Sequence, residues 1–140
     1  MSVTRFEDLK AWQSARELTR QVYELCRNTR LASDFGLRDQ IQRSAVSVMA
    51  NIAEGHGRRG DKEFIQYLKT ARGSSSETLS HAYVAMDMEM VEKAEFEAVS
   101  DLVNRTGAQI SGLIRYLRST AKDEQGIYEL DIETTSRLTD

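Results

Sequence analysis

The sequence predicts an all-α protein that folds as an antiparallel up-down-up-down four-helix bundle. Three observations support this fold class. The 140 residues include no proline, so the main helix-breaking residue is missing. Apolar residues recur at helical spacing in four long segments. Short connections join these segments, and short connections make consecutive helices antiparallel. We expect one bundle over residues 1–120 and an acidic C-terminal tail over residues 121–140.

The first helix is expected over residues 7–28. One apolar stripe runs along it, with steps of four and three residues: Ala11, Ala15, Leu18, Val22 and Leu25. Trp12 and Tyr23 lie beside the stripe, where their polar tips can face either a partner or the bundle edge. Cys26 is expected to be a small buried apolar residue. As the single cysteine, it excludes an internal disulfide and a cysteine-based zinc site.

The second helix is expected over residues 35–54, and its apolar face is unusually wide. The apolar residues cover roughly two-thirds of its circumference, whereas a surface helix of a monomeric bundle needs little more than a third; they are Ile41, Ala45, Val46, Val48, Met49, Ala50, Ile52 and Ala53. Two neighbours in one bundle cannot easily cover a face of that width. The width predicts a homo-oligomer, with Val46 and Ala50 at the interface.

A narrow polar strip completes the second helix, and it is the best candidate for a binding site. Its residues follow helical spacing: Gln40, Arg43, Ser47, Asn51 and Glu54. Together with Trp12, they are binding or interface candidates, and the alternative is a strip that simply faces solvent. Glu54 is also spaced to pair with Arg58, four residues later.

The third helix is expected over residues 61–90, with Asp61 as a good N-cap residue. Its inner stripe contains Phe64, Leu68, Ala71, Ser75, Leu79, Ala82 and Met86. Residues 71–76 are nearly all small, and Gly73 in a helix interior costs about 1 kcal/mol relative to alanine. We expect the close approach of another helix to compensate for that cost.

The fourth helix is expected over residues 94–120, and it carries an unbroken heptad seam. The seam residues alternate in steps of three and four: Phe96, Val99, Val103, Thr106, Ile110, Leu113 and Leu117. Beyond this helix the tail contains Ile127, Tyr128, Leu130 and Ile132 among acidic and polar residues. These apolar residues can dock on a groove of the bundle, and a mostly loose tail is the alternative.

The glycine-rich turn at residues 55–60 matches the Gly-x-Gly-x-x-Gly dinucleotide fingerprint only in its letters. It follows a predicted helix, whereas the fingerprint requires a preceding strand, so a helix–helix turn is the better interpretation. Arg58, Arg59 and Lys62 cluster beside a helix N-terminus, which favours anions. They are anion-binding candidates for a phosphate or an acidic partner, against the alternative of a solvated basic loop.

Composition narrows the function classes. Residues 1–73 carry 13 basic and 9 acidic side chains, and residues 74–140 carry 6 and 13, so no basic surface dominates the chain. This balance argues against general nucleic-acid binding, although it leaves room for a local basic patch. No apolar stretch is long enough to span a membrane, and the N-terminus lacks the apolar segment of a signal peptide, so a cytoplasmic location is expected.

Neither catalysis nor a cofactor is expected. Neither His56 nor His81 has a glutamate three residues before it, as a di-iron bundle requires, so no metal site is predicted. The sequence also lacks the Gly-x-Ser-x-Gly turn that carries a nucleophilic serine in hydrolases.

Three ordered motifs resemble those of the 23S ribosomal RNA intervening-sequence protein family, a bacterial family also called the four-helix-bundle proteins. They occupy residues 6–13 (Phe-Glu-Asp-Leu-Lys-Ala-Trp-Gln), residues 35–55 and residues 58–64. The resemblance implies a bundle that assembles into a ring, typically a pentamer, without catalytic activity. Distant relatives are retroelement accessory proteins that bind nucleic acid, but those relatives are strongly basic and this chain is not.

Two positions depart from the family pattern. Met49 stands where the family usually has proline, so a kink there is not expected. Gly60 stands where the family usually has a capping serine, so Asp61 is expected to supply the cap instead.

The most plausible function is a non-catalytic homo-oligomeric scaffold or adaptor that binds a protein partner. The alternative is a nucleic-acid-associated accessory protein that uses a local basic patch.

Overall fold

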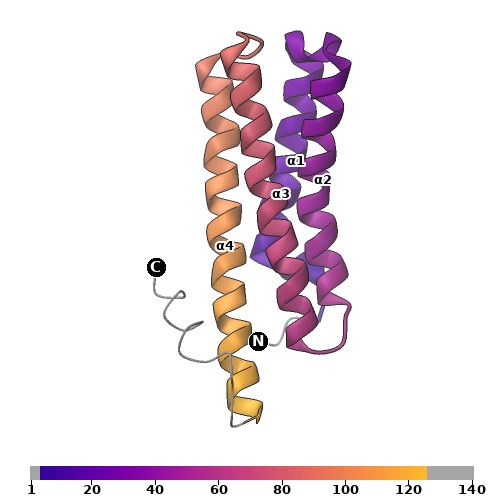
Figure 1. The fold of residues 1–140 in the computed structure, drawn as a ribbon, viewed down its shortest axis with the longest axis vertical. Helices are drawn as coiled ribbons and strands as arrows, with labels where there is room; N and C mark the ends of the chain where they lie inside the picture. The colour runs from indigo at the N-terminus through magenta and orange to yellow at the C-terminus, as the bar shows by residue number, and fades with distance from the viewer. Residues whose placement is uncertain (1–3, 126–140) are drawn as a thin grey trace.

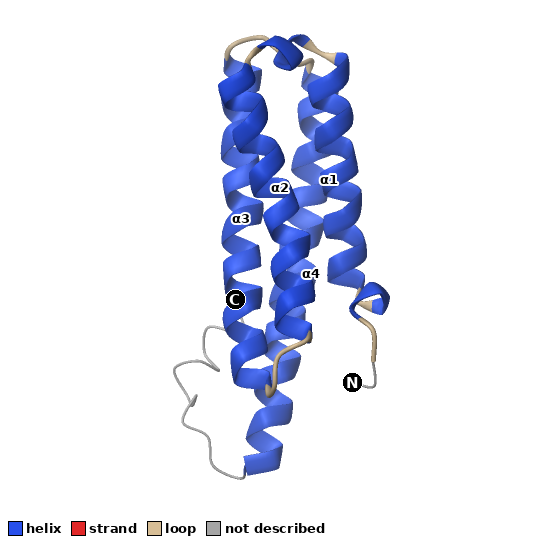
Figure 2. Ribbon diagram, turned by 90° about the vertical axis from the view of Figure 1, so that its right-hand side faces the viewer, coloured by secondary structure: helices blue, strands red, loops and turns tan. Residues whose placement is uncertain are grey.

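The computed structural model describes residues 4–125, and over this range it is an antiparallel four-helix bundle, which confirms the predicted fold class (Figure 1). The four long helices are α1 (Lys10–Asn28), α2 (Phe35–His56), α3 (Asp61–Asp87) and α4 (Lys93–Gln125). Two short 3-10 helices, η1 (Phe6–Asp8) and η2 (Arg30–Ser33), precede α1 and α2. Figure 2 shows that no strand interrupts the helices within the described range.

The core consists largely of the stripes that the periodicity predicts. All five stripe residues of α1 are buried. On α4, Val99, Val103, Thr106, Ile110 and Leu117 are buried, and Phe96 and Leu113 pack against the core from its edge. α3 contributes Phe64, Leu68, Ala71, Ser75 and Ala82, with Leu79 and Met86 half-buried. Burying apolar side chains at about 25 cal/mol per Å² supplies the main driving force for this packing.

The helix ends differ from the predicted bounds where single residues leave the helical conformation. α1 begins at Lys10 rather than residue 7, because Leu9 is extended, with φ −75° and ψ 129°, and points into the core. α3 ends at Asp87 rather than residue 90, because Glu89 has a left-handed φ of 58°. α4 extends five residues past the expected end at 120, to Gln125.

Side chains cap some of the helix ends, but the predicted cap of α3 is wrong. Asp34 Oδ1 accepts the backbone N–H of Leu37 at 3.0 Å and caps α2. Asp61 is the first residue of α3 rather than its cap. Gly60 takes the cap position with a φ of 83°, a conformation that favours glycine, and it has no side chain to make the bond.

The close helix contact that was expected at Gly73 occurs at Gly55 instead. A Cβ atom at Gly73 would meet nothing within 4 Å, because this residue faces outward. A Cβ atom at Gly55 would lie 2.6 Å from Tyr67 Cβ and 2.9 Å from Phe64 Cδ1. α2 and α3 therefore approach closely beside the turn that joins them, and only glycine fits at residue 55. α2 continues through Met49 without interruption.

Cys26 on α1 is buried, as predicted, and burial raises the pKa of its thiol from 9.0 to about 11, against the opposing effect of a hydrogen bond with Gln42. The unfolded chain therefore loses this proton at a lower pH than the folded chain does. The resulting stability is complete below about pH 9 and is lost as the pH rises towards 11.

We predict that the free energy of unfolding falls by about 2–3 kcal/mol more for the wild type than for Cys26→Ala between pH 8 and pH 11. Urea denaturation at each pH measures it. Comparing the two proteins removes the contribution of lysine and tyrosine titration. Identical pH profiles would show that Cys26 ionises as easily in the fold as in the unfolded chain.

No helix in residues 4–125 carries an apolar stretch of the length that a bilayer crossing requires. The tail residues Ile127, Tyr128, Leu130 and Ile132 lie outside the described range.

Candidate functional site

The polar strip of α2 divides between two environments. Gln40, Arg43 and Glu54 are exposed, whereas Ser47 and Asn51 are half-buried. Ser47 contacts Ser74 on α3, and Asn51 bonds to Ser47. The strip as a whole therefore does not simply face solvent. Spacing along one helix cannot reveal this division, because it depends on where the neighbouring helix packs.

Short polar side chains form a hydrogen-bonded ladder between α2 and α3. The hydroxyl groups of Ser47 and Ser74 lie 2.9 Å apart, and Asn51 donates to the backbone oxygen of Ser47 at 2.8 Å and to its hydroxyl at 3.0 Å. One step further along, Thr78 donates to the Ser44 hydroxyl at 2.8 Å, and both residues are buried. Because these groups satisfy one another, the ladder fixes the register of the two helices without leaving unpaired polar atoms there.

Glu54 and Arg58 pair as their spacing predicts. The guanidinium of Arg58 donates to Glu54 Oε2 at 2.6 Å and to the Tyr67 hydroxyl at 2.8 Å, and it lies 5.1 Å from the centre of the Tyr67 ring. The neighbouring Tyr67 hydroxyl and then Glu54 raise the pKa of Arg58. Arg58 thus joins α2 to α3 across the turn.

The structure does not gather the three anion-binding candidates into one site. Arg58 turns back to Glu54 and Tyr67, while Arg59 and Lys62 are exposed. Asp61 and Glu63 lie in the first turn of α3, where they already complement the positive end of the helix dipole. An incoming anion would therefore meet two carboxylates beside these cations.

The outer face of α2 carries a hollow of about 590 Å³ beside α1. Its lining includes three of the sequence candidates, namely Arg43, Val46 and Ser47, and it also contains Tyr23, Asp39 and Gln42. Val46 is 39% exposed and Tyr23 is 42% exposed, and Ala50 is also exposed one turn further along α2. This face combines exposed apolar groups with one cation and one carboxylate, a composition typical of a protein-contact surface.

Trp12 has a different environment from the other candidates. It is half-buried and packs against the core, edge-on to Phe6 with ring centres 5.2 Å apart. Arg16 lies over the same ring at 5.6 Å. These contacts close the lower end of the bundle, so Trp12 has a structural role that its sequence position alone does not indicate.

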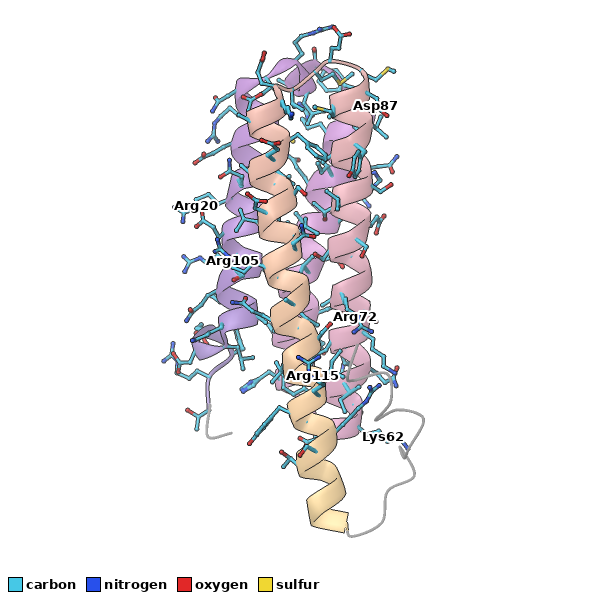
Figure 3. The ribbon with its side chains drawn as sticks, turned by 90° about the vertical axis from the view of Figure 1, so that its left-hand side faces the viewer. Arg20, Lys62, Arg72, Asp87, Arg105 and Arg115 are labelled. Carbon is cyan, nitrogen blue, oxygen red and sulfur yellow. The ribbon has the colours of Figure 1, made fainter. Side chains whose placement is uncertain are left out.

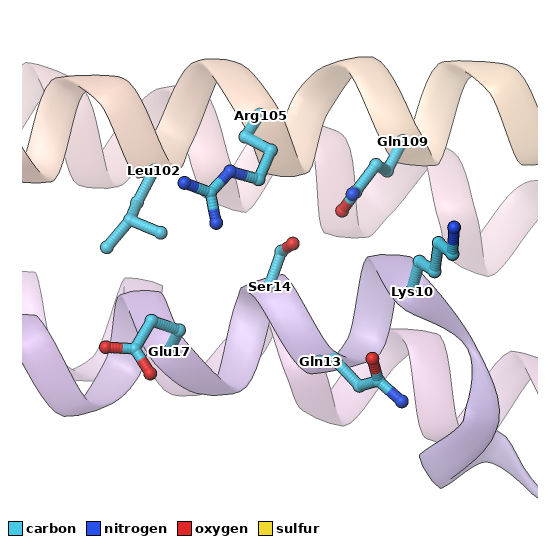
Figure 4. Close-up of a pocket in the computed structure, with 7 residues that line it drawn as sticks. All are labelled: Lys10, Gln13, Ser14, Glu17, Leu102, Arg105 and Gln109. Atoms are coloured by element: carbon cyan, nitrogen blue, oxygen red, sulfur yellow. The ribbon is translucent and has the colours of Figure 1, made fainter.

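A polar groove of about 620 Å³, which the sequence did not predict, runs between α1 and α4 (Figure 4). It is lined by Lys10, Gln13, Ser14, Glu17, Leu102, Arg105 and Gln109. Gln109 Oε1 is buried there and has no donor among the residues that the structure describes. The spacing of these polar residues within each helix does not indicate a groove, because only the tertiary register of α1 and α4 brings them together.

No group of three or more metal-ligating side chains occurs within the described part of the chain. The side chains around the groove and the hollow are amides, short hydroxyls and charged groups suited to hydrogen bonding and ion pairing.

Comparisons with known proteins agree with this fold. The family model of the 23S rRNA-intervening sequence protein matches residues 7–112. A crystal structure of a protein of unknown function from the S23 ribosomal protein family of Bacteroides thetaiotaomicron VPI-5482 superimposes with a TM-score of 0.68 at 20% identity, covering 74% of this chain and 97% of that one. A comparison with curated proteins finds no match. The extent of the family match establishes that this chain belongs to the 23S rRNA-intervening sequence protein family.

Proposed function

We propose that the protein is a non-catalytic homo-oligomer that acts as a protein-binding scaffold, and that it self-associates through the outer face of α2. The observation that carries the proposal is the exposure of Val46 and Ala50 on that face, beside the hollow that Tyr23 and Arg43 line. Exposed apolar groups grouped beside polar ones commonly mark a contact surface.

The surface available for this contact is narrower than the sequence suggests. Of the eight apolar residues on α2, Ile41, Ala45, Val48 and Ile52 are buried within the single chain, and Met49 and Ala53 are half-buried. The bundle therefore covers more of the wide apolar face than expected, because residues at its edges still contact the neighbouring helices. We therefore place the centre of the proposed interface at the exposed Val46 and Ala50, with Asp39 and Arg43, which line the neighbouring hollow, at its rim.

A ring is the assembly that this interface would form most simply. When the outer face of α2 meets a different surface of the next copy, the contact is head-to-tail, and repeated head-to-tail contacts that close produce a ring. The family resemblance suggests five copies. A ring would also present each exposed surface several times, so weak contacts with a partner would reinforce one another.

The proposal of a non-catalytic role draws on the comparisons and on the chemistry of the surface. Neither the matching family nor the similar crystal structure is named for a reaction. The hollow on α2 offers an aromatic ring, an aliphatic side chain and paired charges, which suit recognition.

We predict that Val46→Asp lowers the oligomer mass while the helical content stays at the wild-type level. A carboxylate at a buried interface must lose its hydration, and this penalty disfavours assembly. The measurement is sedimentation-equilibrium mass, with circular dichroism as the check on folding, and Ala50→Asp is a second test of the same face.

Val84→Asp is the matched control, because Val84 is 45% exposed but lies on α3. It should keep the wild-type mass. An assembly that resists Val46→Asp and Ala50→Asp but dissociates with Val84→Asp would move the interface from α2 to α3.

A further inference from the structure

The lower halves of α3 and α4 contain two stretches without carboxylates, although Asp61 and Glu63 precede the stretch on α3, and Asp123 and Glu124 follow the one on α4. Residues 64–76 of α3 and residues 102–122 of α4 contain six lysines and arginines and no aspartate or glutamate. The upper parts of the same helices are different, with Glu77 and Asp87 on α3 and Glu95, Glu97 and Asp101 on α4. The positive charge is therefore concentrated in these two stretches, with carboxylates beyond them on both helices.

Geometry brings four of these cations to one seam. Arg72 donates to the Ser111 hydroxyl at 3.1 Å, which fixes the register of the antiparallel helices and sets Lys69 level with the turn of α4 that holds Arg115 and Arg118. Figure 3 shows Arg72 and Arg115 where α3 and α4 run side by side, with Asp87 at the opposite end of α3. We call Lys69, Arg72, Arg115 and Arg118 the basic seam.

No carboxylate among residues 4–120, the range whose side chains the structure describes, neutralises Arg72 or Arg115. Arg72 bonds to a neutral hydroxyl, and neither arginine forms an ion pair with a described carboxylate. Both side chains are exposed. A ligand that brings several carboxylates would gain Coulomb energy at these two exposed guanidinium groups.

The chain itself contains such a ligand immediately after α4. Residues 126–140 include four carboxylates and one arginine, and Glu129, Asp131 and Glu133 alternate with Tyr128, Leu130 and Ile132. In an extended chain this alternation sets the three carboxylates on one side, about 6.6 Å apart. Gly126 follows the last described residue of α4, and glycine is the usual residue at which a chain leaves a helix and reverses.

The distances agree with a return of this segment along α4. Arg118 and Arg115 precede Gln125 by seven and ten residues, so they lie about 10 to 15 Å up the helix at 1.5 Å per residue. Glu129 to Glu133 follow Gln125 by four to eight residues, which is about 13 to 26 Å of extended chain. The carboxylates can therefore reach the cations without strain in the connection.

We propose that residues 126–140 dock on the basic seam of their own chain, with Glu129, Asp131 and Glu133 facing its cations. The segment covers the basic seam and competes with any other polyanion for it. This docking surface lies on α3 and α4, away from the outer face of α2, and is independent of the proposed self-association.

Site-specific photocrosslinking in the full chain tests the proposal. Ile127, which lies on the same side of an extended chain as Glu129 and Asp131, is replaced by p-benzoylphenylalanine. The protein is irradiated, and the crosslinked peptides are identified by mass spectrometry. We expect crosslinks to residues 64–76 and 102–122, in a product that migrates as a single chain under denaturing conditions. Raising the salt to about 1 M should reduce their yield about tenfold, because the Debye length then falls to about 3 Å.

Charge reversal provides the second arm. Arg72→Glu combined with Arg115→Glu should reduce the yield as strongly as salt does, whereas Arg20→Glu combined with Arg27→Glu, two exposed arginines on α1, should leave it unchanged. The measurement at high salt uses the bundle without charge-reversal substitutions, so its result remains valid even if the double variant folds poorly.

Three outcomes would overturn the proposal. Crosslinks that are absent or fall on other surfaces would exclude docking on the seam, and products of two chains would exclude docking within one chain. Tight binding of a single-stranded RNA to the full chain at physiological salt, lost in the Arg72/Arg115 double variant but kept in the Arg20/Arg27 control, would assign the seam to nucleic acid instead.

Discussion

Val103→Asp is expected to unfold the protein or leave it close to its unfolding midpoint in water. Val103 lies on α4 and is only 6% exposed, within the seam that faces the other three helices. The substitution removes a buried apolar side chain and places a carboxylate where the surrounding core is apolar. Together these effects cost about 4 kcal/mol or more, which is a large part of the 5–15 kcal/mol that stabilises a typical small domain.

Urea unfolding followed by circular dichroism measures this loss. Val84→Asp makes the same chemical change on a side chain that is 45% exposed, and it should alter stability by no more than about 0.5 kcal/mol. If Val103→Asp kept the wild-type helicity and urea midpoint, the assignment of the core to the α4 seam would be wrong.

Gly55→Ala is expected to cost about 1–3 kcal/mol, because the added methyl group overfills a closely packed contact. The new carbon would lie 2.6 Å from Tyr67 Cβ and 3.3 Å from the backbone oxygen of Phe64, and neither atom is the far end of a flexible side chain. α2 and α3 would have to separate, which would also weaken the contact of Arg58 with Tyr67.

Gly73→Ala is expected to increase the stability, whereas Gly55→Ala is expected to decrease it. A Cβ atom at Gly73 would meet nothing within 4 Å, so the gain in helix propensity, up to about 1 kcal/mol, is not opposed by a clash. Thermal unfolding of the two variants under identical conditions measures the difference. Equal stabilities would mean that α2 and α3 do not approach closely at Gly55.

Periodicity was sufficient to predict the fold because each stripe depends only on the geometry of its own helix. The α1 stripe and most of the α4 seam are buried where the spacing of three and four residues places them. The same reasoning could have placed Gly73 correctly. Gly73 follows Phe64 by nine residues, which is two and a half helical turns. Because Phe64 faces the core, Gly73 faces outward.

The helix ends were less predictable, because they depend on single backbone conformations. Leu9 precedes Leu18 by nine residues, so a continued helix would turn Leu9 to the side opposite the α1 stripe. Its extended conformation instead turns its side chain into the core and separates η1 from α1. Glu89 ends α3 in a left-handed conformation that glutamate rarely adopts, so no residue-type signal marks that position.

Only part of the candidate site could be predicted from the sequence, because the contacts between helices, like the helix ends, do not follow from spacing along one helix. The residues of the α2 strip were correctly placed on one side of the helix, but which of them contact α3 depends on the packing of the two helices. Ser47 and Asn51 entered the polar ladder because Ser74 on α3 is at the same level, a relation between segments 27 residues apart in sequence. The groove between α1 and α4 was missed because it arises from the same kind of long-range register.

The central claim is self-association through the outer face of α2, and sedimentation equilibrium of the wild-type protein at micromolar concentration tests it most directly. The proposal predicts a mass of several chains, about 80 kDa for a ring of five chains of 15.9 kDa each. A single species of 15.9 kDa across that concentration range would contradict it.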